Sequence, residues 1–173
     1  DIYGFIGKNG AGKTTTIKMI TGMISPSSGS IKLFGKEKLS DSRKKIGCII
    51  ENPAFYPYMS AHDNIEAQRL LKGVKDKSIT NELLEIVGLK NVGKKKLKNF
   101  SLGMKQRLAI ALALVGDPEI LLLDEPINGL DPSGIKEIRE LVLKLSKEAG
   151  ITVLISSHIL SELTKISSAY GVI

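Results

Sequence analysis

Apolar residues recur along this chain in two alternating patterns. Short, nearly continuous apolar runs predict buried strands at residues 2–6, 30–34, 45–50, 120–123 and 151–155. Between these runs, spacing and capping signals predict helices at residues 13–24, 60–71, 79–87, 102–115, 132–149 and 158–166. Strands that alternate with helices predict an α/β fold with a largely parallel sheet flanked by helices.

Capping residues mark three of the predicted helix starts. Ser60, followed three residues later by Asp63, resembles a capping box. Ser101 is expected to be the N-cap of the next long helix, and Pro132 stands where a first helical residue is expected. These residues fix where the helices begin better than the apolar spacing does.

A phosphate-binding pattern lies between the first strand and the first helix. Residues 7–14 read Gly-Lys-Asn-Gly-Ala-Gly-Lys-Thr and fit G-x-x-x-x-G-K-[ST]. Glycines let backbone N–H groups turn inward onto phosphate oxygens, and the helix start adds its positive end. A glycine-rich turn with a chance lysine is the plainer interpretation, but the strand before the pattern and the helix after it argue against that.

Three side chains of this segment have expected roles. Lys13 supplies a point charge to the β- and γ-phosphates, and the Thr14 hydroxyl is expected to ligate Mg²⁺. Thr15 can reach the α-phosphate. The predicted nucleotide-binding residues here are Asn9, Gly10, Ala11, Gly12, Lys13, Thr14 and Thr15.

Two acids follow the most apolar strand. Asp124 and Glu125 end the run at residues 120–123, and ligands of open α/β sheets bind beyond the carboxyl ends of the strands. Asp124 is expected to hold Mg²⁺ through a water, and Glu125 to polarise a water for in-line attack on the γ-phosphate. An acidic pair alone is more often a strand exit into solvent, but beside a phosphate-binding loop it becomes a strong signal.

Composition and charge exclude several classes of protein. The formal net charge is +7, which attracts phosphate ligands, anionic lipid or nucleic acid. Aromatic residues make up only 5% and tryptophan is absent, which argues against a stacking platform for single-stranded nucleic acid. No apolar run reaches the length of about 18 residues that a spanning helix needs.

The chain resembles the ATP-binding subunits of ABC transporters. The resemblance rests on five stretches in the family's order, and it covers nearly the whole chain. They are the phosphate-binding loop, Phe100–Arg107 (similar to the ABC signature), Asp124-Glu125, Gly129–Pro132 (similar to the D-loop) and Ser156–His158 (similar to the switch histidine). It implies a P-loop NTPase fold over residues 1–173, with a helical signature subdomain at about 60–115. We also expect a chain trimmed at both ends.

The resemblance further implies ATP and Mg²⁺ as cofactors and a head-to-tail homodimer on ATP binding. Ser101 and Gly103 would then approach the γ-phosphate of the ATP held by the second copy. Asp131 would link the two sites, and His158 would contact the γ-phosphate and hold the attacking water with Glu125. Taken singly, Ser101 and Asp131 can be simple helix caps, and His158 a polar residue at a strand exit.

Two departures from the family pattern narrow the resemblance. The signature reads Ser-Leu-Gly-Met-Lys rather than the commoner Ser-Gly-Gly-Gln form, and Glu51 stands where most relatives carry glutamine. Together they resemble the subgroup that exports, or confers immunity to, bacitracin and lantibiotic peptides. Our hypothesis is that the Glu51 carboxylate is a metal ligand that binds Mg²⁺ more strongly than an amide would. The plainer alternative is an acid in a surface loop.

The implied partners are integral membrane transporter subunits, so we expect a peripheral protein at the cytoplasmic face of the cell membrane. The aromatic, proline-containing segment 54–64 could receive such a subunit. The alternative is a soluble ABC ATPase that acts on ribosomes or nucleic acid, which the positive charge favours slightly. A P-loop kinase is weaker, since the Ser101 motif has no role in one. On the main interpretation, no nucleic acid is expected.

Overall fold

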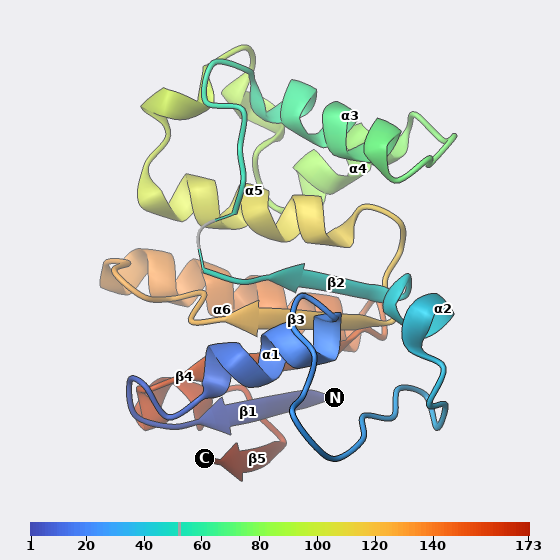
Figure 1. The fold of residues 1–173 in the computed structure, drawn as a ribbon. Coiled ribbons are helices and arrows are strands. Elements are labelled where there is room, and N and C mark those ends of the chain that lie inside the picture. The colour runs from blue at the N-terminus through green and yellow to red at the C-terminus, as the bar shows by residue number, and fades with distance from the viewer. Residues whose placement is uncertain (52) are drawn as a thin grey trace. The chain divides into compact units, whose positions relative to one another are not determined.

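The apolar runs form one five-stranded sheet in the computed structural model, which describes residues 1–51 and 53–173. The strands are β1 (Ile2–Ile6), β2 (Ile46–Ile49), β3 (Ile120–Asp124), β4 (Thr152–Ser157) and β5 (Ala169–Val172). Their order is β2-β3-β4-β1-β5, and each pairing between neighbours is parallel. The arrows in Figure 1 accordingly point the same way. The prediction of a largely parallel sheet is confirmed.

The described chain divides into two compact units. The first holds the sheet and consists of Asp1–Glu51, Pro118–Pro126 and Leu143–Ile173. The second is helical and consists of residues 53–117 and Ile127–Val142. Helix α6 (Pro132–Lys147) contributes residues to both units, and its first residue is the predicted Pro132.

In the first unit, α1 (Lys13–Thr21) packs against the sheet through Ile17. This side chain is fully buried in a cluster with Leu33, Ile46 and Leu122. The helix ends earlier than the predicted residue 24, because the N–H of its C-cap, Gly22, bonds to the carbonyl of Met19. Its start is therefore fixed by the sheet, and its end by local backbone geometry.

Two predicted elements of the first unit are wrong or too long. The predicted strand at residues 30–34 is a tight turn in which Leu33 and Lys36 make an isolated antiparallel bridge. Phe34 lies there at φ 53°, which no extended strand can contain. The predicted helix at 158–166 shrinks to α7 (Leu160–Leu163).

Two short elements escaped the sequence analysis. Helix α2 (Leu39–Arg43) is too short to show an apolar period. Strand β5 is an edge strand with mostly exposed residues, so its sequence lacks the buried apolar run that would predict a strand.

The second unit is built around three helices, α3 (Ala61–Leu71), α4 (Ile79–Ile86) and α5 (Leu102–Leu114). Each packs against the other two, and two short 3₁₀ turns, η1 (Lys90–Val92) and η2 (Leu97–Asn99), connect α4 to α5. The predicted capping box is confirmed, since Ser60 Oγ accepts from the Asp63 N–H and the Asp63 carboxylate accepts from the Ser60 N–H. Ser101 Oγ likewise accepts from the Met104 N–H and caps α5 as predicted.

A buried polar network joins α3 to α4. The guanidinium of Arg69 donates to the Glu66 carboxylate at 2.9–3.2 Å and to the Val74 carbonyl at 2.5 Å. The Thr80 hydroxyl donates to the same carboxylate. The hydrogen bonds from Arg69, and then that from Thr80, lower the pKa of Glu66 to about 2. The negative charge of Glu66 therefore contributes to the stability of this unit.

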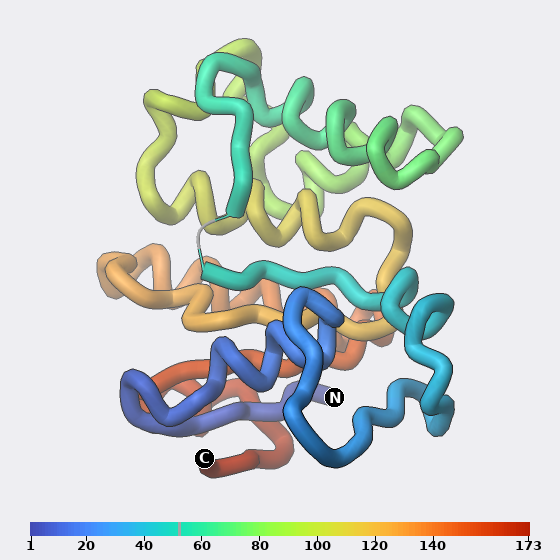
Figure 2. Tube along the Cα trace, viewed as in Figure 1, coloured from blue at the N-terminus to red at the C-terminus, as the bar shows by residue number. Residues whose placement is uncertain are grey.

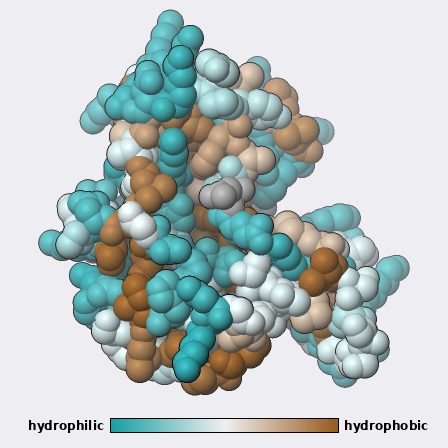
Figure 3. Space-filling view, turned by 60° about the vertical axis from the view of Figure 1, so that its left-hand side comes forward, coloured by the Kyte–Doolittle hydropathy of each residue, from teal (hydrophilic) through white to brown (hydrophobic). Residues whose placement is uncertain are grey.

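The surface drawn in Figure 3 contains both hydrophilic and hydrophobic residues. Hydrophobic residues reach it in small groups between hydrophilic ones. Among the described residues, no helix combines the length and the apolar character needed to cross a membrane.

Candidate functional site

The carboxyl ends of β1, β3 and β4 lie along one edge of the sheet, because all three strands run parallel. Figure 2 shows the chain turning from β1 into α1 at this edge, where β3 and β4 also end. In the register of the sheet, Ile6 stands opposite Ser157, and Asp124 opposite Ser156. The topology thus brings together three sequence stretches that are far apart along the chain.

The loop after β1 has the backbone of a phosphate cradle. Gly10 and Gly12 adopt φ 83° and 107°, a left-handed region in which a side chain would be strained. The N–H of Ala11 donates to the Lys8 carbonyl at 3.1 Å. Within the described residues, the N–H groups of Asn9, Gly10 and Gly12 donate to no protein acceptor, so they are available to an anion at the start of α1.

Lys13 lies under this loop and is only 5% exposed. Its Nζ donates to the carbonyls of Gly7 at 2.7 Å and Lys8 at 3.1 Å, and lies 3.2 Å from Glu125 Oε1. A buried ammonium group held in place by the backbone is a preorganised positive charge. The exposed Thr15 side chain follows on the same helix.

Asp124 is buried and is held by hydroxyl groups. Thr14 Oγ1 donates to Asp124 Oδ2 at 2.6 Å, and Ser156 Oγ donates to Asp124 Oδ1 at 2.6 Å. No lysine or arginine of the described chain forms an ion pair with Asp124. A buried carboxylate without a cation beside a threonine hydroxyl offers the hard oxygen donors that Mg²⁺ prefers.

Glu125 stands at the centre of a second set of contacts. Its backbone lies at φ 48°, an uncommon conformation for a residue with a side chain, and its N–H donates to Ser156 Oγ at 2.9 Å. His158 Nδ1 lies 2.9 Å from Glu125 Oε2. The other oxygen, Oε1, is buried and accepts no hydrogen bond from the described residues, although Lys13 Nζ is near it. This oxygen is thus paired with the Lys13 ammonium, and the carboxylate is held between Lys13 and His158.

The structure places Glu51 apart from these contacts. Its carboxylate pairs with Lys18 Nζ at 2.7 Å, and no hydrogen bond or ion pair links it to Thr14 or Asp124 in the described part of the chain. Glu51 is the last residue of Asp1–Glu51, the first segment of the first unit, and adopts φ 56°. Its predicted role as a metal ligand therefore stays a prediction.

The remaining predicted residues gather in the second unit. Ser101, Gly103 and Asp131 line one hollow of about 340 Å³, together with residues of α5 and the start of α6. Ser101 and Asp131 are exposed, and Asp131 Oδ1 accepts from the Gly134 N–H at 3.3 Å. Both residues are thus helix caps, and their polar groups remain accessible to a further molecule.

A metal at the first unit's edge would need ligands beyond the protein. In residues 1–51 and 53–173, no group of three or more His, Cys, Asp or Glu side chains could hold a metal ion. Thr14 and Asp124 fit a Mg²⁺ ion that takes its other ligands from phosphate oxygens and water.

Sequence reasoning missed two residues of this edge. It assigned no role to Ser156, whose fully buried hydroxyl joins the Asp124 carboxylate to the backbone of Glu125. The two serines that end β4 after a run of apolar residues were the available signal. It also missed Lys18, whose importance depends on a partner 33 residues away.

Comparison with known proteins agrees with this geometry. The family model described as "ABC transporter" matches residues 1–128. The chain belongs to the ABC transporter family. This membership removes the P-loop kinase alternative.

Curated relatives cover the full chain. The bacitracin transport ATP-binding protein BcrA of Bacillus licheniformis is 51% identical over 176 residues, which span 100% of this chain and 58% of that protein. The lantibiotic transport ATP-binding protein SrtF of Streptococcus pyogenes is 48% identical over 172 residues, 99% of this chain and 74% of that protein. This ABC family chain thus spans between about half and three quarters of the length of these relatives.

Solved structures give the same fold. The cbiO1 protein of Clostridium perfringens, part of the ABC transporter complex cbiONQ, matches with a TM-score of 0.87 and 28% identity over 99% of this chain and 72% of that chain. A dimeric ATP-binding cassette in a post-hydrolysis state, bound to ADP and Pi, matches with a TM-score of 0.81 and 26% identity. The match covers 94% of this chain and 76% of that chain. The chain therefore has the P-loop NTPase fold predicted from its sequence.

Proposed function

We propose that this chain is the ATP-binding and ATP-hydrolysing part of an ABC transporter that powers export of, or immunity to, a peptide antibiotic such as bacitracin or a lantibiotic. The observation that carries the ATPase proposal is the edge where Lys13, Thr14, Asp124, Glu125 and His158 are joined by direct contacts. The transported class is supported by the names of the relatives, which are bacitracin and lantibiotic transport proteins.

Nucleotide binding would use the loop after β1. The N–H groups of Asn9, Gly10 and Gly12 at the start of α1 bind phosphate oxygens, and Lys13 neutralises the β- and γ-phosphates. Thr15 reaches the α-phosphate. Thr14 and Asp124 would hold Mg²⁺, which neutralises charge on the phosphates when it is bound.

Hydrolysis would use Glu125 and His158. Glu125 accepts the proton of the attacking water through Oε1, which the contact with Lys13 Nζ holds beside the phosphate-binding loop. His158 holds the other carboxylate oxygen through Nδ1, which fixes the direction in which Oε1 points. Its remaining ring nitrogen is then left to contact the γ-phosphate.

The second copy of the chain would complete the site. Ser101 and Gly103 sit at the capped start of α5, where exposed backbone and hydroxyl groups can bind the γ-phosphate held by another copy. Asp131 lines the same hollow and would link the two nucleotide sites. A solved structure of the same fold, dimeric and bound to ADP and Pi, supports the proposal of a dimer.

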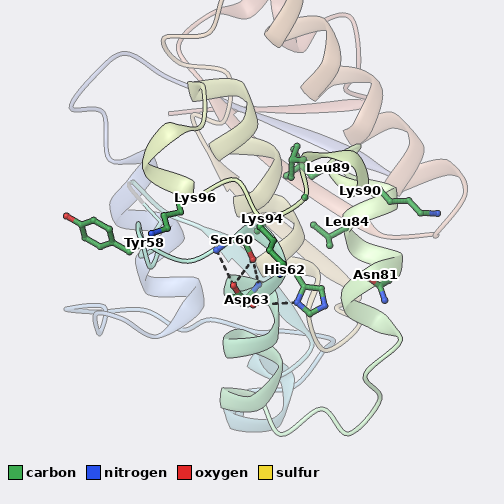
Figure 4. Close-up of a pocket in the computed structure, with 13 residues that line it drawn as sticks. Tyr58, Ser60, His62, Asp63, Asn81, Leu84, Leu89, Lys90, Lys94 and Lys96 are labelled. Carbon is green, nitrogen blue, oxygen red and sulfur yellow. Dashed lines mark hydrogen bonds and ion pairs between the residues drawn. The ribbon is translucent and has the colours of Figure 1, made fainter.

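The partner surface for a membrane subunit would be a hollow of about 610 Å³ in the second unit (Figure 4). Buried Leu84 and Leu89 line it, whereas Lys94 and Lys96 at its rim have no ion-pair partner in the described part of the chain. The only acid lining it, Asp63, is engaged by Ser60. Apolar lining with unpaired cations fits an acidic, amphipathic segment of an integral membrane subunit. The chain would then lie at the cytoplasmic face of the membrane.

Charge reversal tests this docking surface. In cells that also produce the membrane subunits, Lys94→Glu combined with Lys96→Glu should strongly reduce recovery of the chain with the membrane fraction, because like charges would meet. Lys147→Glu, on the exposed end of α6, serves as the control and should change nothing. Unchanged recovery of the double variant would contradict this assignment.

The competing function is a soluble ABC ATPase that acts on ribosomes or nucleic acid. The net charge of +7 is the observation in its favour. The relatives named above are transport proteins, which favours the transporter.

Glu125→Gln tests the ATPase proposal. We expect ATP binding to persist, while phosphate release falls by about 10²–10⁴-fold because the general base is lost. Glu119→Gln changes an exposed acid just before β3 and should leave turnover unchanged. Normal turnover of Glu125→Gln would overturn the assigned base.

A further inference from the structure

The two lysines of α1 each pair with an acid that follows the carboxyl end of a strand, Glu125 after β3 and Glu51 after β2. Lys13 lies 3.2 Å from Glu125, and Lys18 lies 2.7 Å from Glu51. Among the described residues, Asp124 accepts hydrogen bonds from the neutral hydroxyls of Thr14 and Ser156 alone. Of these three acids, Asp124 alone therefore carries a negative charge that no lysine of α1 offsets.

Lys18 is also close to the predicted metal ligand Thr14. The two residues are four apart on α1, so they lie on one face of the helix and about 6 Å apart along its axis. Thr14 points to Asp124, while Lys18 holds the Glu51 carboxylate. Glu51 is thus held about one helical turn from the place where Thr14 and Asp124 would bind a divalent cation.

We propose that Lys18 is a positioning residue that competes with the nucleotide's divalent cation for the Glu51 carboxylate. This inference rests on the proposed ATP site and deepens it. With Lys18 present, its ammonium group keeps the Glu51 carboxylate away from the cation and compensates its charge. The cation is then bound mainly through Asp124. Without Lys18, Glu51 is free to join the cation or to attract it.

This account explains how the chain accommodates an acid at position 51. An unpaired carboxylate beside Asp124 and Glu125 would put three negative charges at one sheet edge. Such a site would bind a divalent cation more tightly and release it more slowly after each turnover. The pair with Lys18 moderates that affinity.

Mn²⁺ binding to the ADP-loaded chain, followed by electron paramagnetic resonance, measures the effect without any turnover. Lys18→Met should tighten Mn²⁺ binding about three- to tenfold at low salt, since Lys18 no longer holds and neutralises the Glu51 carboxylate. Lys18→Arg should keep the wild-type affinity. In a Glu51→Gln background, Lys18→Met should have much less effect, because the carboxylate that Lys18 holds is gone.

Lys44→Met is the matched control. It breaks an exposed ion pair with Asp41 of nearly the same length, 2.8 Å, elsewhere in the first unit. It should leave the Mn²⁺ affinity unchanged.

Two outcomes overturn the proposal, and they are distinguishable. If ADP binds normally but Lys18→Met leaves the Mn²⁺ affinity unchanged, or changes it equally in the Glu51→Gln background, the competition does not exist. If a fluorescent ADP analogue fails to bind the unaltered chain even in the presence of Mg²⁺, both this inference and the proposed ATP site fall.

Discussion

The sheet edge of the first unit and the signature hollow of the second hold their functional side chains in different ways. At the sheet edge, Thr14, Ser156 and Asp124 are joined to one another by side-chain hydrogen bonds across three elements. In the hollow, Ser101 and Asp131 contact only backbone N–H groups within their own helix starts. The side chains of the sheet edge are held by tertiary contacts, whereas the hollow exposes capped helix starts that a ligand can contact.

This difference has a physical basis. A buried carboxylate needs partners from the fold itself, since an unsatisfied charge in the interior is very unfavourable. An exposed helix start can satisfy its groups with water until an anion arrives. We therefore expect a binding site that a second copy completes to have exposed helix caps, as the hollow does. We expect a site that one copy forms by itself to have buried side chains joined by hydrogen bonds, as the sheet edge does.

Of the substitutions considered, Lys13→Ala should have the largest effect on ATP binding at the sheet edge. Removal of its buried charge is expected to weaken ATP binding about 10–100-fold, because charge-assisted bonds to phosphate are lost. Lys8→Ala, in the same loop but exposed, should have little effect. Equilibrium binding of a fluorescent ATP analogue measures both variants, and equal losses would contradict the central role of Lys13.

A matched pair of serine substitutions sharpens the comparison. Ser156→Ala leaves Asp124 Oδ1 and the Glu125 N–H without their partner, so we expect a loss of about 1–3 kcal/mol in the free energy of unfolding. Ser101→Ala removes only an exposed N-cap and should lower it by about 1 kcal/mol.

Urea denaturation of the two variants compares their stabilities, and binding and turnover assays separate their functions. Ser101→Ala should leave ATP binding to a single copy unchanged while it lowers turnover. Equal destabilisation by both substitutions would mean that the sheet edge is no more preorganised than the hollow.

The smallest expected effect concerns the stability of the second unit in acid. The pKa of Glu66 is lowered to about 2, so its contribution is fully present above its ordinary pKa of 4.5 and is lost as the pH falls toward 2. Because the side chain is partly exposed, we expect about 1–2 kcal/mol. The difference in unfolding free energy between the unaltered chain and Glu66→Gln should therefore shrink between about pH 6 and pH 3. A constant difference would contradict this role for the carboxylate.

Local sequence patterns predicted much of the fold. The parallel sheet, the helix starts at Ser60, Ser101 and Pro132, and the phosphate-binding loop follow from short-range signals. The predicted strand at residues 30–34 failed because an apolar run does not make a strand without a neighbour to pair with. Strand β5 was missed for the converse reason, since pairing with β1 forms it despite its weak pattern.

By itself, the sequence determined which residue types are present and in what order, and that was enough to predict the P-loop NTPase fold and to suggest the ABC family. Only the tertiary structure decided which of these side chains meet. It placed Ser156 in a hydrogen bond with Asp124 and paired Glu51 with Lys18. The reason is that helix caps and loops depend on neighbours in sequence, whereas the partner of a charged side chain depends on which strands and helices the fold brings side by side.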